Sequence, residues 1–356
     1  MPPREIFPNP KQVRALTPKS EAYAEKLRSF MPPQELTDSG EIPPGYELRR
    51  PNEEERQLMM KAEQFLDETF RFFSVAPPEI HLPSLCILQK KEEDSHSMSS
   101  PAIISGHIDM HLQMMLTQFN PQLPDGARRF LHIVLHEFTH AKSKNLWTIG
   151  RKTTRRTSGL DVVTEHFQTD SSQLDSDVSN ARFFIALNEA ITETLTILTC
   201  ESLLSSSWFR ETYGENEERT RAQREKYCAE NDIYDAEIVA VSQDSNGEPQ
   251  SALSYKNERI VLSFLLDRIA QESTIPRQDV FRLFVQDYAE GTMERTKPLL
   301  RATFGPDILR VLAVWTPNEL QTDESIYLYL KEKDPNIRDI MANNYLTKRG
   351  SIPQSL

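Results

Sequence analysis

Residues 132–141 read HIVLHEFTHA, and three of the eight histidines of the chain fall within these ten positions. The surrounding pattern predicts a helix from about residue 126 to residue 144. On a helix, residues four apart project from one face, so His136 and His140 can direct two imidazole nitrogens at one ion. Glu137 lies beside them and faces the same cleft. This H-E-x-x-H arrangement predicts a metal site, and an ordinary helix with surface histidines is the alternative.

The predicted chemistry is that of catalytic zinc, which takes three protein ligands and leaves the fourth position to a water molecule. Zinc lowers the pKa of that water, and a neighbouring carboxylate is suited to take its proton. Glu137 is therefore the expected general base. Random placement of residues with this composition gives roughly 0.03 such motifs per chain, so the motif needs support from a third ligand.

A second predicted helix, from about residue 181 to residue 205, contains ALNEAITETL at positions 186–195. Glu189 and Glu193 lie four apart on one face of it, with Asn188 directly in front. Glu189 is the expected third ligand because it combines the helix with a paired carboxylate. The competing third ligands are Asp161, Glu165 and His166, near the end of a predicted hairpin, and His132, which is expected to be a packed or solvated bystander.

HEFTH followed by NEAITE resembles the gluzincin metallopeptidases, whose motif is HExxH and then NExxxD, or a close variant, on a later helix. The resemblance implies that Glu137 is the general base. It also implies that Glu193, in place of the family's aspartate, orients a ligand histidine through its second ring nitrogen, with Asn188 as a further supporting residue. The zinc ligands that it implies are His136, His140 and Glu189.

The resemblance covers about residues 100–205, together with a generally helical C-terminal half. The separation of His140 and Glu189 is 49 positions (189 − 140), which is longer than in thermolysin-type enzymes. The GxMEN box of the related aminopeptidases does not precede the motif. The longer metzincin motif is also absent, because Ser143 and Leu146 stand where that motif has glycine and histidine.

The fold class that follows is α+β, with a zincin-like catalytic core and a mainly helical C-terminal half. The core is expected to combine a small mixed sheet with the HExxH helix. The expected divisions are a proline-rich extended or disordered arm (1–50), a zincin-like catalytic domain (51–210), a charged insertion or linker (211–250) and a helical C-terminal domain (251–356).

Local patterns predict further elements. Asn52 and the three glutamates after it predict the start of a helix. Alternation over 107–114 predicts one half-buried strand, whose HIDMH stretch (107–111) forms an exposed face, lines a substrate cleft or binds a second metal. The other expected elements are a strand in 79–90, a two-stranded hairpin over 145–168 around the basic turn RKTTRR (151–156), a strand in 236–242, and helices in 258–273, 277–292 and 298–315.

A peptidase also needs a donor for the oxyanion of the tetrahedral intermediate, beyond the metal itself. In gluzincins this donor is a tyrosine or histidine from the downstream helical part. Tyr255 opens the first downstream helix and is the candidate for this catalytic role. Arg259 lies one turn further along the same face. Simple packing at the helix start is the alternative role for Tyr255.

The composition narrows the classes of partner. A net charge of −12 disfavours nucleic acid and anionic lipid, because both require a basic face. No apolar stretch approaches the length of about eighteen residues that spans a membrane, and the N-terminus lacks the apolar core of a secretory signal. Cys86, Cys200 and Cys228 form no CxxC pair, which is typical of a reducing compartment, so a cytoplasmic location is expected.

Together these patterns predict a zinc metallopeptidase with one Zn²⁺ per chain, acting on a peptide or protein substrate. No nucleic-acid or membrane partner is expected, and no oligomeric state is predicted. Two alternatives stay open. One is a zinc-binding interaction or regulatory protein that retains the zincin scaffold, and the other is a zinc hydrolase that acts on a non-peptide amide or ester.

Overall fold

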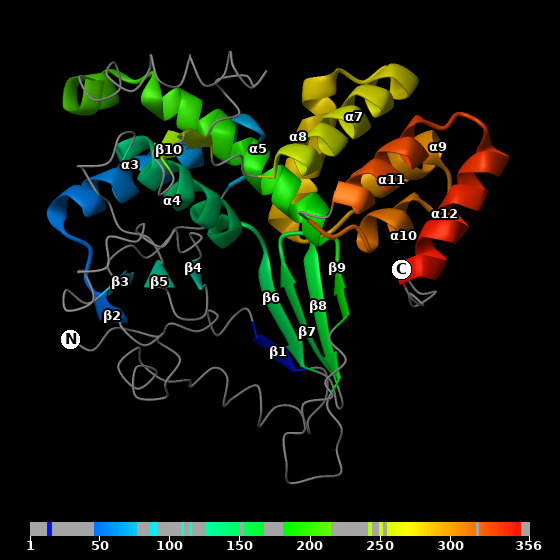
Figure 1. The fold of residues 1–356 in the computed structure, drawn as a ribbon, viewed down its shortest axis with the longest axis horizontal. Helices are drawn as coiled ribbons and strands as arrows, with labels where there is room; N and C mark the ends of the chain where they lie inside the picture. The colour runs from blue at the N-terminus through cyan, green and yellow to red at the C-terminus, as the bar shows by residue number, and fades with distance from the viewer. Residues whose placement is uncertain are drawn as a thin grey trace, which may run out of the picture.

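The chain forms an α+β structure that is mainly helical (Figure 1). The helices form an upper layer in Figure 1, and a five-stranded sheet extends below them. The predicted fold class is confirmed at this level. The computed structural model describes residues 13–15, 46–76, 86–90, 108–109, 114–115, 126–149, 153–166, 181–214, 241–243, 249–251, 255–317 and 320–349.

The described helices fall into two blocks of the sequence. A helical stretch at 207–214 follows the first block. The predicted segment 298–315 proves to be two helices, because Gly305, with a φ of 90°, interrupts it. The first block holds α3 (Glu53–Phe72), α4 (Gly126–Lys142) and α5 (Ile185–Leu204), and the second holds α7 (Lys256–Ser273), α8 (Arg277–Glu290), α9 (Thr296–Phe304), α10 (Ile308–Ala313), α11 (Leu320–Lys331) and α12 (Pro335–Arg349).

Helix α3 begins where the sequence predicts, because Asn52 and Glu55 cap each other. The Glu55 N–H donates to Asn52 Oδ1 at 2.8 Å, and the Asn52 N–H donates to Glu55 Oε2 at 2.9 Å. The apolar face of α3, which includes Leu58, Leu66 and Phe70, is fully buried. This face packs on α4 and α5, so α3 supports both helices that carry the predicted metal ligands.

Lys142, at the C-terminal end of α4, ties that helix to α3. Its Nζ lies 2.9 Å from Glu63 Oε1 and 2.8 Å from Asp67 Oδ1, and its side chain is fully buried. A buried ammonium group needs such partners, because an unpaired charge removed from water is strongly destabilising. The pair of contacts therefore fixes the end of the HExxH helix against its neighbour.

The second predicted helix begins later than the sequence pattern indicates. Residues 181–183 form strand β9 (Ala181–Phe183), and α5 starts at Ile185. Phe184 changes the direction of the chain in a left-handed conformation, with a φ of 61°. Its N–H donates to the carbonyl of Ala313 at 2.9 Å. The prediction was wrong here because β9 is defined by backbone pairing with a distant strand, which leaves no mark on helical periodicity.

The five-stranded sheet has the order β1-β6-β7-β8-β9. Strand β1 pairs with β6 in parallel, whereas the other neighbours pair antiparallel. Ser158 lies opposite Asp161, so Gly159 and Leu160 form a tight turn between β7 and β8. The bounds are β1 (Val13–Ala15), β6 (Asn145–Ile149), β7 (Thr153–Ser158) and β8 (Asp161–His166).

This sheet corrects the predicted two-stranded hairpin over 145–168, which contains three strands. Residues 153–156 of the predicted basic turn belong to β7, which pairs with β6 on one side and with β8 on the other. The two other residues of that turn, 151 and 152, lie outside the described residues. The basic charge of the segment suggested a turn, although its threonines are β-branched and favour a strand.

A four-stranded sheet corrects the single strand predicted over 107–114. Ile108 lies opposite Met115 and Asp109 opposite Met114, so the chain reverses between these two short strands. Alternation alone does not show where a strand turns back. His107 and His111 lie outside the described residues. The strand order is β2-β3-β5-β4, with β2 (Tyr46–Arg49), β3 (Cys86–Lys90), β5 (Met114–Met115) and β4 (Ile108–Asp109).

Two further predicted strands are found in part. The prediction for 79–90 is confirmed over Cys86–Lys90, and its earlier residues lie outside the described part of the chain. The prediction for 236–242 overlaps only the start of β10 (Val241–Gln243). Strand β10 pairs antiparallel with β11 (Pro249–Ser251) in a separate two-stranded sheet.

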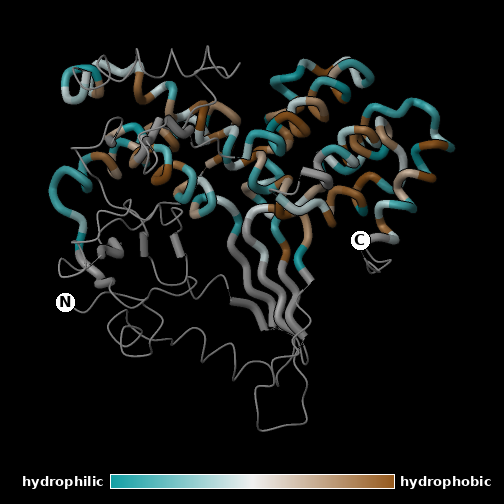
Figure 2. Tube along the Cα trace, viewed as in Figure 1, coloured by the Kyte–Doolittle hydropathy of each residue, from teal (hydrophilic) through white to brown (hydrophobic). Residues whose placement is uncertain are grey.

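One buried cluster of apolar residues joins the described helices from α3 to α12. Figure 2 shows apolar stretches mainly where helices meet. Helix α5 lies at the centre, with Leu187, Ile191 and Leu195 fully buried, and contacts α3, α4, α7 and α8. Such an apolar helix is typical of a central position. The core thus crosses the predicted boundary between 51–210 and 251–356, and the domain bounds themselves stay a prediction.

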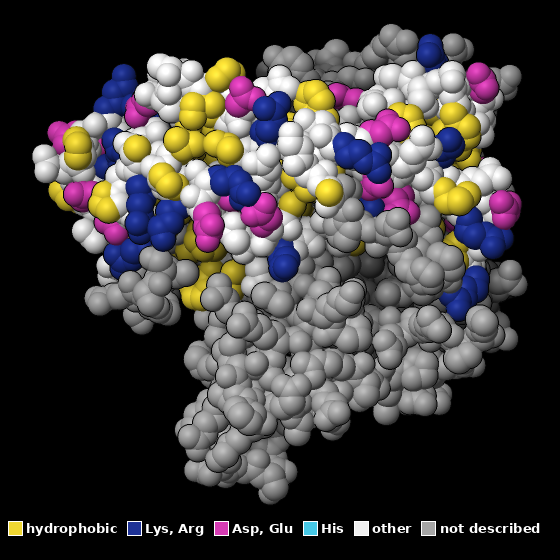
Figure 3. Space-filling model, turned by 180° about the vertical axis from the view of Figure 1, so that it is seen from behind, with side chains coloured by type: hydrophobic (Ala, Val, Ile, Leu, Met, Phe, Trp, Pro, Cys, Tyr) yellow, Lys and Arg dark blue, Asp and Glu magenta, His cyan; other side chains and the backbone are white. Residues whose placement is uncertain are grey.

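The described surface carries charges of both signs. On the face in Figure 3, basic and acidic side chains are interspersed among apolar ones. In the part of the chain that the structure describes, no helix is both long enough and apolar enough to cross a bilayer.

Candidate metal centre

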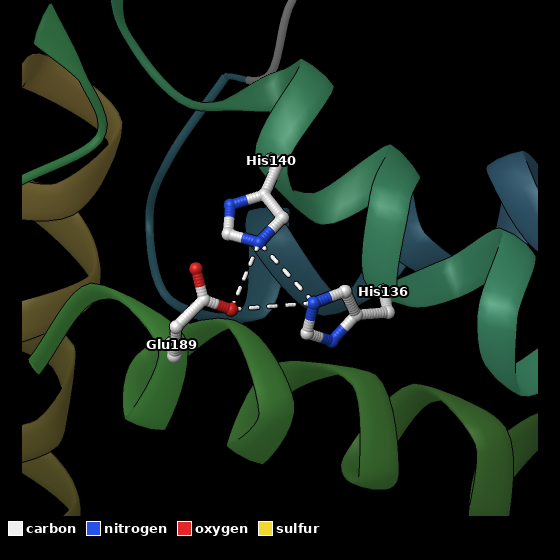
Figure 4. A group of neighbouring side chains, drawn as sticks. All are labelled: His136, His140 and Glu189. Carbon is white, nitrogen blue, oxygen red and sulfur yellow. Dashed lines mark hydrogen bonds and ion pairs between the residues drawn. The ribbon is translucent and has the colours of Figure 1, made fainter. Parts of the chain in front are cut away.

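His136 and His140 on α4 meet Glu189 on α5 (Figure 4). Their Nε2 atoms lie 3.2 Å apart, and Glu189 Oε2 lies 3.4 Å from His136 Nε2 and 3.3 Å from His140 Nε2. The four-residue spacing puts both rings on the face of α4 that α5 covers. The three predicted metal ligands are therefore brought together and can hold a metal ion.

The triangle of donor atoms has the size that zinc requires. Bonds from zinc to nitrogen or oxygen are about 2.0–2.1 Å long, so two ligands at a tetrahedral angle are about 3.3–3.4 Å apart. The observed separations of 3.2, 3.3 and 3.4 Å fit this geometry. Three electron-rich atoms at such separations repel one another unless a cation or protons lie between them. Two imidazoles and one carboxylate are also a donor set of catalytic zinc sites.

Glu193 holds the other ring nitrogen of His136. The Nδ1–H group donates to Glu193 Oε2 at 2.9 Å, and the Glu193 side chain is fully buried. Burial would lower the pKa of His136, but hydrogen bonds to Glu189 and Glu193 raise this pKa well above its usual value. With the proton on Nδ1, the Nε2 lone pair can face a metal ion. Glu193 thus lies where an orienting carboxylate is expected.

The second nitrogen of His140 faces neutral groups. His140 Nδ1 lies 3.4 Å from Thr192 Oγ1 and 3.5 Å from Asn188 Nδ2. The amide nitrogen can only donate, so the Nδ1–H of a metal-binding His140 donates to the Thr192 hydroxyl. Asn188 Oδ1 accepts the N–H groups of Leu160 at 2.8 Å and Asp161 at 3.4 Å. Asn188 therefore anchors the turn between β7 and β8 to the ligand helix α5.

Tyr288 on α8 completes this network and has no sequence signal that could have found it. Its Oη lies 2.9 Å from Thr192 Oγ1, 96 positions away, and donates to the carbonyl of Thr139 at 3.1 Å. Burial raises the pKa of the Tyr288 hydroxyl, which therefore stays protonated. Helices α4, α5 and α8 are thus joined by hydroxyl groups next to His140.

The turn between β7 and β8 approaches this network so closely that it requires glycine. Gly159 has a φ of 58°, and a Cβ atom there would overlap Asn188 Oδ1 and lie 2.7 Å from Tyr288 Cε2. Its N–H donates to the carbonyl of Lys144, just after α4, at 2.8 Å. Both the left-handed backbone and the lack of space exclude a side chain.

Glu137, the predicted general base, is buried on α4 beside the first ligand histidine. After burial and the hydrogen bonds to Glu189 and Glu193, the charge of Glu137 is a further cause of the altered pKa of His136, which it raises. The Glu137 carboxylate thus lies within electrostatic reach of the metal ligands. Its catalytic role stays a prediction.

Tyr255 lies directly over a metal ligand. Its ring stacks on the ring of His136 with 5.6 Å between the centroids and an angle of 7° between the planes. Tyr255 precedes α7 in a left-handed conformation, with a φ of 49°, and its carbonyl accepts the N–H of Arg259 at 3.0 Å. Burial, followed by the charges of Glu189 and Glu137, raises the pKa of the Tyr255 hydroxyl. Its place at the start of the helix is as predicted, and its role as oxyanion donor stays a prediction.

The competing third ligands are found apart from the triangle or bound to other groups. Both carboxylate oxygens of Asp161 accept hydrogen bonds from Arg182 on β9, at 2.7 to 3.1 Å. Burial would lower the pKa of Arg182, but Asp161 and then the charge of Glu189 raise it. Arg182 is therefore a positive charge near the centre that sequence reasoning missed. Glu165 and His166 lie at the opposite end of β8 from Asp161.

His132 is not the bystander that the sequence indicated. It is 5% exposed, and its Nε2 lies 2.9 Å from Glu193 Oε1. The contact has the separation of an ion pair rather than the alignment of a hydrogen bond. The prediction was wrong because a four-residue step rotates a helical position by only about 40°, so His132 stays on the face of His136. That spacing was the signal that could have found it.

Comparison with known proteins adds no relative to this picture. Among the family models, the curated proteins and the solved structures, none matches the chain.

Proposed function

We propose that the protein is a zinc-dependent metallopeptidase that hydrolyses peptide bonds in a peptide or protein substrate. The observation that carries this proposal is the triangle of His136 Nε2, His140 Nε2 and Glu189 Oε2, with sides of 3.2 to 3.4 Å. Its size and donor set suit one zinc ion. The order HExxH, then NExxE on a later helix, agrees with the gluzincin pattern and with a zincin-like core.

The charges of the centre support a divalent cation. Burial would raise the pKa of the carboxyl groups of Glu189 and Glu193, but the nearby histidines hold both pKa values well below their usual range. Both groups are therefore ionised, and two carboxylates balance one Zn²⁺. Glu137 is then a third acidic group, which no ligand role requires.

In the proposed reaction each residue has a separate task. Zinc held by the three ligands would polarise the scissile carbonyl and make a water molecule more acidic. Glu137 accepts a proton from the attacking water and passes it to the leaving amine. Tyr255, stacked on His136, offers a hydroxyl group to the developing oxyanion. Arg182 adds a fixed positive charge near the ligands.

Metal content is the first test. Elemental analysis of the purified full chain, after incubation with zinc and removal of excess, should give one zinc ion per chain. Glu189→Ala should lose it, because two imidazoles alone leave the ion without its third ligand. A wild-type chain that takes up no zinc would contradict the proposal.

The general base is tested separately from the metal. Glu137→Gln should keep zinc and lower the hydrolysis of a peptide library by about 10²- to 10⁴-fold, the usual contribution of general-base catalysis. Glu201→Gln, an exposed change on α5, is the matched control and should keep full activity. Cleavage of small acylated amides or esters instead of peptides would favour the other zinc hydrolase class. Zinc binding without any hydrolysis would favour an interaction role.

A further inference from the structure

Helices α4 and α5 present ionisable side chains to each other in alternation. Along α4, His132, His136 and His140 are spaced four apart, and along α5, Glu189 and Glu193 are spaced likewise. The first histidine contacts Glu193, the middle one contacts both glutamates, and the last contacts Glu189. The helices are therefore antiparallel, and these five side chains form one row, here called the ladder. His132 is the member of the ladder that the proposed zinc site does not use.

Glu193 has both of its carboxylate oxygens occupied. Oε2 accepts from His136 Nδ1 at 2.9 Å, and Oε1 lies 2.9 Å from His132 Nε2. The Glu193 side chain is fully buried, and that of His132 is 7% exposed. An ionised carboxylate only accepts, so His132 must carry a proton on Nε2 to face it. Donors on two different oxygens fix the plane of a carboxylate, whereas a single donor leaves it free to rotate.

Neither simple packing nor a second metal ion accounts for this contact as well. A residue that only filled space would be better apolar, because burying a polar ring costs free energy that an alkyl side chain does not. A second ion would need three ligand atoms close together. Among the described residues, the atoms of His136, His140 and Glu189 are the ones that come close enough to share an ion.

We propose that His132 is a positioning residue for the metal centre. It holds the Glu193 carboxylate in the plane that fixes the ring of His136, with Nε2 directed at the ion. The inference rests on the zinc site of the proposed function, and it does not depend on the reaction or the substrate. Without His132, Oε1 of Glu193 would be a buried acceptor without a donor, and the carboxylate would turn toward other groups.

Zinc affinity of the full chain tests this role. His132→Phe keeps a ring and removes the donor, whereas His132→Gln places an amide N–H near the position of Nε2. The dissociation constant is measured at fixed pH by competition with a chromophoric zinc chelator. His132→Phe should weaken binding about 10-fold and His132→Gln less than about 3-fold, since partners of ligating histidines contribute about 10- to 100-fold. Val134→Ala, fully buried on α4 but outside the ladder, is the control and should lower stability without changing zinc affinity.

A double-mutant cycle shows whether His132 acts through Glu193. In a Glu193→Gln background, His132→Phe should cause no further loss of zinc affinity, because the carboxylate to be positioned is gone. If His132→Phe does not fold, His132→Ala takes its place in the cycle. Cobalt(II) gives a second readout, since its visible absorption should weaken and shift in His132→Phe as the tetrahedral site is distorted, and should recover in His132→Gln.

Several results would overturn the positioning role. His132→Phe with wild-type affinity is one, and His132→Gln as weak as His132→Phe is another. Two zinc ions per wild-type chain would show that His132 is a ligand in its own right. A wild-type chain that binds no zinc would contradict the proposed function together with this inference, so the two failures are distinguishable.

Discussion

Gly159 shows how a single residue outside the ligand helices can control the metal centre. Its left-handed backbone and its contact with Asn188 and Tyr288 leave no space for a Cβ atom. Gly159→Ala should therefore lower the free energy of unfolding by about 2–4 kcal/mol, from backbone strain and overpacking together. Chemical denaturation measures this loss, and zinc affinity should fall as well because Asn188 is displaced.

Gly214→Ala is the matched control for this change. A Cβ atom at Gly214 would meet nothing within 4 Å, so its free energy of unfolding should change by less than about 1 kcal/mol. Equal losses in the two variants would show that Gly159 is not under steric constraint.

At the same scale, the ligands could be predicted from the sequence, and most of their supporting residues could not. His136, His140, Glu189 and Glu193 follow from four-residue spacing on two helices, which is a local property. Thr192 lies in the same motif as Glu189 but carries no charge that marks it as a partner. Nothing in the sequence relates the distant Tyr288 to this motif, because its contact depends on how α8 packs.

At the scale of elements, Lys142 holds α4 against α3. Lys142→Met should lower the free energy of unfolding by about 2 kcal/mol, because Glu63 and Asp67 would then face each other without a cation. This is less than the usual loss for a fully buried pair, since both carboxylates are partly exposed. Urea denaturation of the wild type and the variant measures the difference.

A surface ion pair is the comparison for that prediction. Arg277 and Asp267 are each about half exposed, and Arg277→Met should cost less than about 1 kcal/mol. If Lys142→Met were equally mild, the buried contacts of Lys142 would contribute little to the attachment of α4.

Elements with a strong local signal were predicted well, and elements defined by distant pairing were not. The capping residues of α3 and the apolar periodicity of α4 act within one or two turns. In contrast, β9 exists because it pairs with β8, and β7 because it has partners on both sides. These strands were read as a helix start and a turn, since partners in a sheet cannot be identified from the segment alone.

At the scale of the whole molecule, one ion should influence the stability of all the helices. Zinc would link α4 and α5, and α5 lies in the apolar cluster that α3 to α12 share. Calorimetry of the zinc-loaded chain should show one unfolding transition that a chelator shifts to lower temperature. Ligand binding at about 1,000 times its dissociation constant stabilises a protein by about 4 kcal/mol.

Glu189→Ala should keep the single transition and lose its response to zinc. Two transitions, of which one ignores zinc, would show that residues 51–210 and 251–356 unfold as separate domains.

The ladder between α4 and α5 also determines how these helices are aligned along their axes. An apolar interface tolerates a slip of one turn, about 5.4 Å, with little change in buried area. Within the ladder, such a slip in either direction would leave one histidine without a carboxylate and one carboxylate with a single histidine. Buried polar groups are known to select one register in this way. The imidazoles and carboxylates that await the ion therefore also select the helix alignment in which the ion can bind.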